Sequence, residues 1–300
     1  MGKWPLSDES TGVLLAVLAA LGFSLKAIFV KLAYATGPVD AVTLLALRMI
    51  FSLPVFLWVG LRASRGAPAL TGRDWATVTV LGLLGYYGAS ILDFMGLQSI
   101  TAGLERLILF TYPTLTLLLG ALLYGETITR RQWLALLLCY GGIAAAFAHD
   151  LKVAGDGVAV WLGSGFVFAS SLSYAFYLSG SGKMLARLGV ARFTALALLV
   201  STAATLGHFF ATHPVSALVL PMDIYAYGVA MAVLSTVIPV FALSTAIRRI
   251  GSGRAALIGT IGPLLTIALG WWLLAEAVSV WQIIGAGLVV AGVLLVSKKA

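Results

Sequence analysis

The hydropathy pattern of the chain is a series of long apolar runs separated by short polar segments. Each run has about 20 residues, which is the length that an α-helix needs to cross the hydrocarbon core of a bilayer. The alternation of polar and apolar positions that marks barrel strands is absent, so the runs are interpreted as helices. The pattern predicts an all-α integral membrane protein with ten transmembrane helices, near residues 12–35, 40–61, 75–97, 103–124, 130–148, 158–179, 193–211, 223–246, 255–274 and 280–297.

The second half of the chain repeats the first at a distance of 150 residues. The stretch from Gly103 to Gly142 coincides with Gly253 to Gly292 without a gap, including the pairs Pro113/Pro263, Gly120/Gly270, Glu126/Glu276 and Gln132/Gln282. Apolar segments resemble one another by composition alone, but a joint match of Pro, Gly, Gln and Glu argues against that explanation. We predict two five-helix repeats, over residues 12–148 and 158–297, as in many secondary transporters that bind substrate between repeats.

Composition restricts the class of protein further. Hydrophobic residues make up 61% of the chain and charged residues 10%, with a mean hydropathy of +1.04. A soluble domain cannot bury that much apolar surface, so lipid is the expected surrounding of most of the chain. Ten helices with short loops leave no room for a separate soluble domain. The single cysteine, Cys139, excludes an intrachain disulfide bond.

Positive charge alternates between successive loops, which predicts an orientation. One side of the predicted membrane holds 14 of the 19 basic residues: Lys3, Arg62, Arg65, Arg73, Arg130, Arg131, Lys183, Arg187, Arg192, Arg248, Arg249, Arg254, Lys298 and Lys299. By the positive-inside rule both termini are cytoplasmic, in a bacterial-type inner membrane. Since five helices per repeat is an odd number, the second repeat is inverted relative to the first. The net charge of +8 follows this alternation, so we expect no nucleic-acid partner.

One segment and two dipeptide motifs connect the repeats to a known family. Residues 96–106, then Tyr112-Pro113 and Gly125-Glu126, resemble an EamA-type repeat of the drug/metabolite transporter superfamily, and the second half has the corresponding Gly262-Pro263 and Ala275-Glu276. The chain is similar to the YddG amino acid exporters of that superfamily. The resemblance implies ten helices and a central cavity lined mainly by helices 1, 3, 4, 6, 8 and 9. It also implies transport of amino acids, metabolites or drugs.

Lys26, Lys31, Arg48 and Asp93 fall inside predicted helices, where a charge at mid-helix costs at least about 2.5–3.5 kcal/mol. With a rise of about 1.5 Å per residue, Lys26 and Arg48 lie near the midplane and Lys31 and Asp93 roughly 10 Å nearer the outside. Asp93 is expected either to form an ion pair with Lys31 or Arg48, or to bind a coupling proton. Lys26 has no acid at its own depth, so we expect it either to bind a substrate carboxylate or to line a wet cavity.

The second repeat lacks this set of charges, because the positions near those of Lys26 and Arg48 hold Leu178 and Val200. The charged site is therefore predicted to be one-sided. Glu105 and Arg106 open the fourth predicted helix at its outer end, where an acid is favoured by the helix dipole. We expect these two residues to form a surface ion pair, with a guard at the outer mouth as the alternative role of Arg106.

Aromatic residues concentrate on the predicted helices 3, 4 and 6. If these helices line the cavity, as the resemblance implies, the aromatic side chains form a wall suited to flat apolar groups. Packing or contact with lipid is the alternative for each of them. The predicted wall consists of Tyr86, Tyr87, Phe110, Tyr112, Phe168, Tyr174 and Tyr177. Pro113 and Pro263 each remove a helix hydrogen bond near mid-membrane, and we expect them to kink helices 4 and 9 as hinges.

Motifs for catalysis, cofactors or metals are not found. Gly180 to Lys183 ends like a phosphate-binding loop, but Tyr177 replaces the first Gly and Met184 the Ser/Thr, and the three histidines lack metal-site spacing. We predict a secondary transporter, not an enzyme, that exports small metabolites, with aromatic or apolar amino acids favoured. The alternatives are a drug exporter of the same fold and a membrane-embedded enzyme. We expect no cofactor, a small-molecule substrate and a monomer in the lipid bilayer.

Overall fold

A computed structural model of the protein describes residues 8–125, 127–153 and 156–297. Glu126 of the repeat match, and Lys3, Lys298 and Lys299 of the orientation argument, lie outside the described residues. Within those ranges the chain forms helices joined by short loops, and no strand is present. The predicted all-helical membrane fold is confirmed.

The first repeat begins with two long helices, α1 (Asp8–Thr36) and α2 (Ala41–Ser64). The third membrane span is built from α3 (Gly72–Gly82), the π-helical turn η1 (Leu83–Gly88) and α4 (Ala89–Leu97). The fourth predicted helix consists of two pieces, α5 (Ala102–Leu109) and α6 (Tyr112–Tyr124). The repeat closes with α7 (Arg130–Val153).

The second repeat follows the same order. It begins with α8 (Gly157–Leu188) and α9 (Val190–Thr212), followed by the short 3₁₀ helix η2 (Val215–Leu218). The next span comprises α10 (Met222–Ala232), the π-helical turn η3 (Val233–Val237) and α11 (Ile238–Gly259). The repeat ends with α12 (Gly262–Leu274) and α13 (Val280–Ser297).

The helix lengths agree with a membrane protein. Among the described residues, eight helical spans are long and apolar enough to cross a bilayer, and two shorter apolar helices cover residues 262–274 and 280–295. One difference from the predicted runs concerns residues 255–274. Their first part continues from α11 across a kink at Gly251, where φ is 81°, and α12 alone has 13 residues. Only glycine adopts that conformation without strain, so the kink is encoded locally.

The two repeats share their irregular features as well as their helices. The π-helical turns η1 and η3 begin at Leu83 and Val233, 150 residues apart. Gly125 and Ala275, also 150 residues apart, both adopt the left-handed conformation after a helix end, with φ of 70° and 53°. Such interruptions of regular helices are rare and frequently lie at functional sites. Their recurrence at the same register supports a duplicated unit.

The two prolines start helices instead of bending them. Pro113 and Pro263 lie in the first turns of α6 and α12, just after helix breaks at residues 110–111 and 260–261. In that position the missing proline N–H removes no helical hydrogen bond, and the fixed φ angle favours helix initiation. The expected loss of a mid-helix hydrogen bond is therefore wrong, although the helices are interrupted where the kinks were predicted. A hinge at these breaks stays a prediction.

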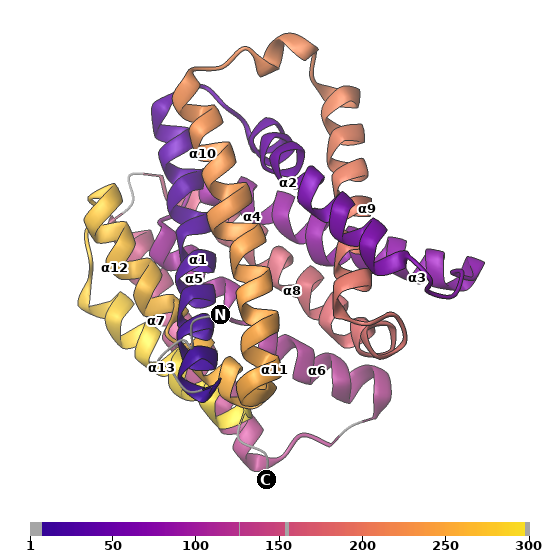
Figure 1. Ribbon diagram of the computed structural model, residues 1–300. Coiled ribbons are helices and arrows are strands. Elements are labelled where there is room, and N and C mark those ends of the chain that lie inside the picture. The colour runs from indigo at the N-terminus through magenta and orange to yellow at the C-terminus, as the bar shows by residue number, and fades with distance from the viewer. Residues whose placement is uncertain (1–7, 126, 154–155, 298–300) are drawn as a thin grey trace.

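Helices of one repeat pack mainly on helices of the other. In Figure 1, α1 (indigo) lies beside α10 and α11 (orange), and α7 packs against α13. The α7–α13 contact is close enough that a Cβ atom at Gly142 would lie 2.6 Å from the carbonyl oxygen of Gly285. Small residues allow this approach in membranes, where close packing and not the hydrophobic effect holds helices together. The two repeats therefore form one bundle with a shared interior.

Candidate functional site

An ion cluster lies inside the bundle where α1, α4 and α5 meet. The ammonium Nζ of Lys26 lies 2.6 Å from Oδ2 of Asp93 and 3.4 Å from Oε1 of Glu105. The side chain of Lys26 is 18% exposed, whereas those of Asp93 and Glu105 are 2% and 0% exposed. One partly accessible cation is thus shared by two fully buried carboxylates.

This geometry corrects the predicted partners of Lys26 and Asp93. Lys26 does have acidic partners, and Asp93 pairs with it instead of with Lys31 or Arg48. The depth count along each helix failed because it ignored helix tilt, commonly about 20°, and the reach of the four-carbon lysine stem. The ammonium of Lys31 instead donates to the carbonyl oxygen of Ile100, at 3.0 Å.

Glu105 and Arg106 are also placed differently from the prediction. Both are buried, at 0% and 7% exposure, so the expected surface ion pair is wrong. The cause is that α5 packs against α12 and α1, so its beginning is covered by both repeats. A sequence signal existed: the position equivalent to Glu105 in the second repeat is Ala255, a small apolar residue that is itself buried.

Two buried arginines flank the cluster without joining it. The guanidinium of Arg48 donates to the hydroxyl of Ser90 at 2.8 Å and lies 5.0 Å from the centre of the Phe94 ring. That of Arg106 lies 5.3 Å from the centre of the Phe110 ring. Cation–π contacts of this kind hold a guanidinium in place in a dry environment. Each arginine is therefore directed to a ring face, away from direct pairing with the carboxylates.

The cluster is incompletely hydrogen-bonded. Oδ2 of Asp93 and Oε1 of Glu105 face the Lys26 ammonium, but the other oxygen of each carboxylate, and the Nε atoms of Arg48 and Arg106, are buried without a hydrogen-bond partner within the described residues. A buried polar group left unsatisfied costs about 1–3 kcal/mol, and native structures avoid this almost everywhere. Such a concentration of unsatisfied atoms around one ammonium is expected where water or a polar ligand completes the cluster.

An aromatic row extends from the cluster. The Phe110 ring, which holds Arg106, lies 5.9 Å from that of Tyr112, and Tyr112 lies 5.2 Å from Tyr174. The row continues through Tyr177, stacked on Tyr174 at 5.5 Å, to Tyr86, whose hydroxyl lies 3.1 Å from that of Tyr177. Five of the seven predicted wall residues are therefore in contact with one another, and they come from both repeats.

The other two predicted wall residues lie elsewhere. The hydroxyl of Tyr87 lies 2.9 Å from Nδ1 of His208, so this side chain faces α9. Phe168 is 39% exposed on α8, the position of a side chain in contact with lipid. The prediction grouped aromatic residues by helix, but neighbouring residues on one helix face different partners. Grouping by helix therefore could not separate these two residues from the row.

The second repeat closes over the cluster mainly with backbone. The hydroxyl of Ser24, on α1, donates to the carbonyl oxygen of Gly262 at 3.2 Å. A Cβ atom at Gly262 would lie 3.2 Å from the Phe110 ring and 3.3 Å from the Arg106 guanidinium. Glycine at this position therefore lets the start of α12 approach the charged helix α5 closely. All five charged residues belong to the first repeat, in agreement with the predicted one-sided site.

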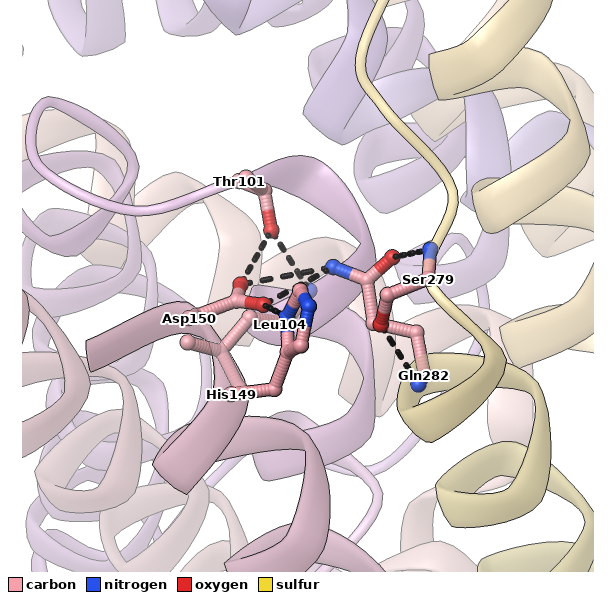
Figure 2. Close-up of polar contacts among 6 residues, drawn as sticks. All are labelled: Thr101, Leu104, His149, Asp150, Ser279 and Gln282. Atoms are coloured by element: carbon pink, nitrogen blue, oxygen red, sulfur yellow. Dashed lines mark hydrogen bonds and ion pairs between the residues drawn. The ribbon is translucent and has the colours of Figure 1, made fainter. Parts of the chain in front are cut away.

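A polar network joins the repeats where α7 ends and α5 and α13 begin, and Figure 2 shows its contacts. The carboxylate of Asp150, at the end of α7, accepts hydrogen bonds from Thr101 (3.1 Å) and from the side-chain amide of Gln282 (3.2 and 3.3 Å). His149 lies 3.3 Å from the same carboxylate. Gln282 and Ser279 also cap the start of α13. The network therefore connects α5 and α7 of the first repeat with α13 of the second.

Glu276 makes a second connection at the same end. Its two carboxylate oxygens accept from the backbone N–H of Ala102, at 3.0 and 3.1 Å, at the positive end of the α5 dipole. Burial raises the pKa of Glu276 above its ordinary value, while the Ala102 hydrogen bond and the charge of Lys31 oppose this rise. Glu276, which the repeat match pairs with Glu126, therefore caps the start of α5, the helix that carries Glu105.

The opposite end of the bundle is also held by pairs between repeats. Arg254, which follows the Gly251 kink, pairs with Glu9 of α1. Arg187 of α8 lies 2.8 Å from the carboxylate of Asp74 on α3. The ion cluster therefore lies between two sets of polar contacts, one at each end, that tie the repeats together.

The comparison with known proteins identifies the fold family. The EamA-like transporter family matches residues 10–148 and, a second time, residues 161–298. The chain belongs to this family. It is therefore a multi-pass membrane protein of a transporter family, built from two repeats, and the predicted resemblance to the drug/metabolite transporter superfamily is confirmed.

Relatives of the family agree with this assignment. The chain is 28% identical over 295 residues to the uncharacterized transporter YcbK of Bacillus subtilis, covering 94% of this chain and 91% of YcbK. It is 24% identical to the uncharacterized transporter YyaM of the same organism, covering 75% and 74% of the two chains. A crystal structure with a TM-score of 0.67 and 20% identity covers 96% of both chains and supports the fold alone.

Proposed function

We propose that the protein is a secondary transporter that exports small zwitterionic metabolites, with amino acids bearing aromatic or apolar side chains favoured. The observation that supports this most strongly is the environment of Lys26. An ammonium group has three N–H donors, and that of Lys26 has two acidic neighbours, Asp93 at 2.6 Å and Glu105 at 3.4 Å. The third donor, on a side chain that is 18% exposed, suits a substrate carboxylate.

The two carboxylates supply the complementary half of the site. Beside the oxygens that face Lys26, Asp93 and Glu105 each have one buried oxygen with no hydrogen-bond partner within the described residues. A substrate ammonium group supplies such donors, and charge-assisted hydrogen bonds of this type are about twice as strong as neutral ones. A molecule with a carboxylate and an ammonium close together, as in an α-amino acid, therefore matches the cluster in both charge and hydrogen bonding.

The aromatic row supports a preference for flat or apolar side chains. It begins at Phe110, directly beside Arg106, and continues through Tyr112 to Tyr174 on the other repeat. Aromatic faces bury apolar groups well and tolerate several shapes. In this proposal the charged groups of the substrate bind at the cluster and its side chain lies along the row.

Alternating access would follow from the two sets of contacts that tie the repeats together. A site between repeats must open to one side at a time, and rocking of the repeats achieves this. Opening toward one side requires separation of the network around Asp150 and Gln282, and opening toward the other requires separation of the Glu9–Arg254 and Asp74–Arg187 pairs. The helix breaks before Pro113 and Pro263 are the proposed hinges.

The proposed location is a bacterial-type inner membrane, with both termini cytoplasmic. The alternating distribution of Lys and Arg supports this orientation. In it, the Asp150 network faces the periplasm, and the Glu9–Arg254 and Asp74–Arg187 pairs face the cytoplasm. The proposed substrate-loaded species is a monomer, in which both repeats of one chain contribute to the aromatic row beside the cluster.

A counterflow assay in proteoliposomes tests the proposal. Vesicles with purified protein are loaded with one unlabelled amino acid at a time and diluted into the same labelled amino acid. Transient accumulation of labelled phenylalanine, tyrosine or leucine above empty vesicles supports the proposal. Folded protein that moves no amino acid in this panel refutes it.

An exporter of organic cations is the second candidate. The unsatisfied carboxylates of Asp93 and Glu105 would attract such a substrate. The Lys26 ammonium weighs against it, because an organic cation without a carboxylate offers Lys26 no acceptor and places a second positive charge beside it. Labelled tetraphenylphosphonium in the same vesicles distinguishes the two candidates, since only the cation exporter accumulates it.

A further inference from the structure

The pair of buried carboxylates carries an inference about coupling, which rests on the proposed function. Two acidic side chains, Asp93 and Glu105, share a single ammonium, and the charges acting on Glu105 are those of Asp93, Lys26 and Arg106. Carboxylates that share one site cannot both ionise at low cost, because each raises the energy of the other's charge. One added proton relieves this repulsion.

The surrounding charged groups do not supply a second partner for the pair. Arg48 of α2 bonds to Ser90 and lies on Phe94, and Arg106 of α5 lies on Phe110. Tyr34 of α1 donates its hydroxyl to the carbonyl oxygen of Phe94 at 2.8 Å. The helix α12, which also packs here, has no ionisable residue; those of α8 are the row tyrosines Tyr174 and Tyr177, with Lys183 and Arg187 in its last two turns.

We propose that Asp93 and Glu105 together hold one exchangeable proton in the empty transporter and release it when a substrate ammonium group binds, so that one proton is exchanged for one substrate. The balance is simple. Before binding, the two carboxylates face the Lys26 ammonium and one proton. After binding, they face two ammonium groups and both are ionised, and the proton leaves to water on the side to which the site is open.

The direction of coupling follows from this competition. A proton and a substrate ammonium occupy the same carboxylate lone pairs, so the site carries one or the other across the membrane. Substrate moves outward while a proton moves inward, which suits an exporter driven by an inward proton gradient. The carboxylate of the substrate, bound at Lys26, does not take part in the exchange.

Infrared spectroscopy of the purified protein tests the shared proton without any substrate. A protonated carboxylic acid has a carbonyl-stretch band that an ionised carboxylate lacks. Near neutral pH the wild-type protein is expected to show a band from the Asp93 and Glu105 pair, seen as the difference from the spectrum of either variant. Both Asp93→Asn and Glu105→Gln are expected to lose it, because the remaining carboxylate then has Lys26 to itself. Asp223→Asn, which removes an exposed acid of α10, is the matched control and keeps the band.

Gel filtration establishes which variants are folded, and either folded single variant decides the question. Absence of the band from the wild-type protein, or its survival in a folded Asp93→Asn or Glu105→Gln variant, overturns the shared proton. In vesicles, a pH gradient with the inside alkaline and the outside acidic should drive labelled phenylalanine outward in the wild type. Phenylalanine exchange that ignores this gradient overturns the coupling. The infrared result stands independently of whether phenylalanine is the substrate.

Discussion

The side-chain amide of Gln282, at the start of α13, donates to both oxygens of the Asp150 carboxylate at the end of α7, at 3.2 and 3.3 Å (Figure 2). For the equivalent residue of the first repeat, Gln132, the contacts with other described residues are the capping bonds of its own helix with Thr129. Gln282 therefore makes a contact with Asp150 in addition to its capping bonds. In the second repeat it also fastens the two halves of the protein to each other.

The difference between the two glutamines predicts unequal costs of substitution. Gln132→Leu removes capping contacts, worth about 1 kcal/mol of the free energy of unfolding. Gln282→Leu removes the same kind of contacts and a hydrogen bond to a charged group, so it should cost about 1.5–3 kcal/mol more. Thermal unfolding of both variants in detergent measures this difference. Equal losses of stability would show that the bridge to Asp150 contributes nothing.

The π-helical turn η1 predicts a second contrast, between two glycines. A Cβ atom at Gly85 would lie 2.3 Å from the Tyr177 ring, whereas at Gly165 of α8 no atom lies within 4 Å. Gly85→Ala should therefore overpack the aromatic row and cost about 1–3 kcal/mol. Gly165→Ala should be neutral or stabilise the helix by about 0.5–1 kcal/mol. The same unfolding assay compares them, and a harmless Gly85→Ala would contradict the described packing of Tyr177.

The stability of the folded protein should depend strongly on the ion pairs of Lys26. Lys26→Met leaves Asp93 and Glu105 buried without their shared cation, and breaking a buried ion pair on one side costs about 3–5 kcal/mol. The triple variant Lys26→Met, Asp93→Asn, Glu105→Gln should recover most of this loss, because all three charges are removed together. Folded yield and thermal stability measure both variants. A stable single variant would mean that the ion pairs do not form.

The lowered pKa of Asp40 predicts that the protein loses stability at acid pH. Burial alone would raise the pKa of Asp40, but hydrogen bonds from Thr43 and Val42 and the charge of His213 outweigh it and lower the pKa below its ordinary value. A carboxylate with a lowered pKa in the folded state stabilises the protein above its unfolded pKa, and this contribution is lost as the pH falls through the folded pKa. The stabilisation therefore disappears on the acid side of the ordinary aspartate pKa.

The comparison that isolates this effect is wild type against Asp40→Asn, which keeps the cap of α2 but not the charge. The stability difference should be less than about 1 kcal/mol near neutral pH, because the carboxylate is 43% exposed and water screens it. It should vanish at strongly acid pH. A difference that stays constant down to that range would show that the charge of Asp40 has no role.

The sequence predicted the architecture well because the hydropathy runs and the repeat match each draw on many residues. Hydropathy runs located the spans, and the register of 150 residues located the repeats and the breaks before Pro113 and Pro263. The π-helical turn at Leu83, which packs against α8 and α9, had no such signal. The break at Gly251 depends on the positive φ angle of one glycine, and the sequence alone does not show which glycine adopts it.

The sequence singled out several residues of the candidate site, but it did not predict which of them form ion pairs. Lys26, Asp93 and the tyrosines were recognised because charges and aromatic clusters are conspicuous in apolar helices. Their partners were not, because a difference of a few ångströms in tilt or side-chain reach changes which charges meet. Glu105 was assigned to a surface ion pair because it lies one turn inside a helix, and the sequence does not show that the other repeat covers that turn.

Competition for phenylalanine counterflow in wild-type proteoliposomes tests the central claim, that the cluster binds a zwitterion, most directly. Unlabelled phenylalanine, phenylalaninamide and 3-phenylpropionate are compared as inhibitors of labelled phenylalanine uptake. The last two lack one charged group each, and a lost charge-assisted hydrogen bond should weaken competition by about 10- to 100-fold. Phenylalanine alone is therefore expected to compete strongly. Equal competition by all three compounds would contradict binding of the substrate through Lys26, Asp93 and Glu105.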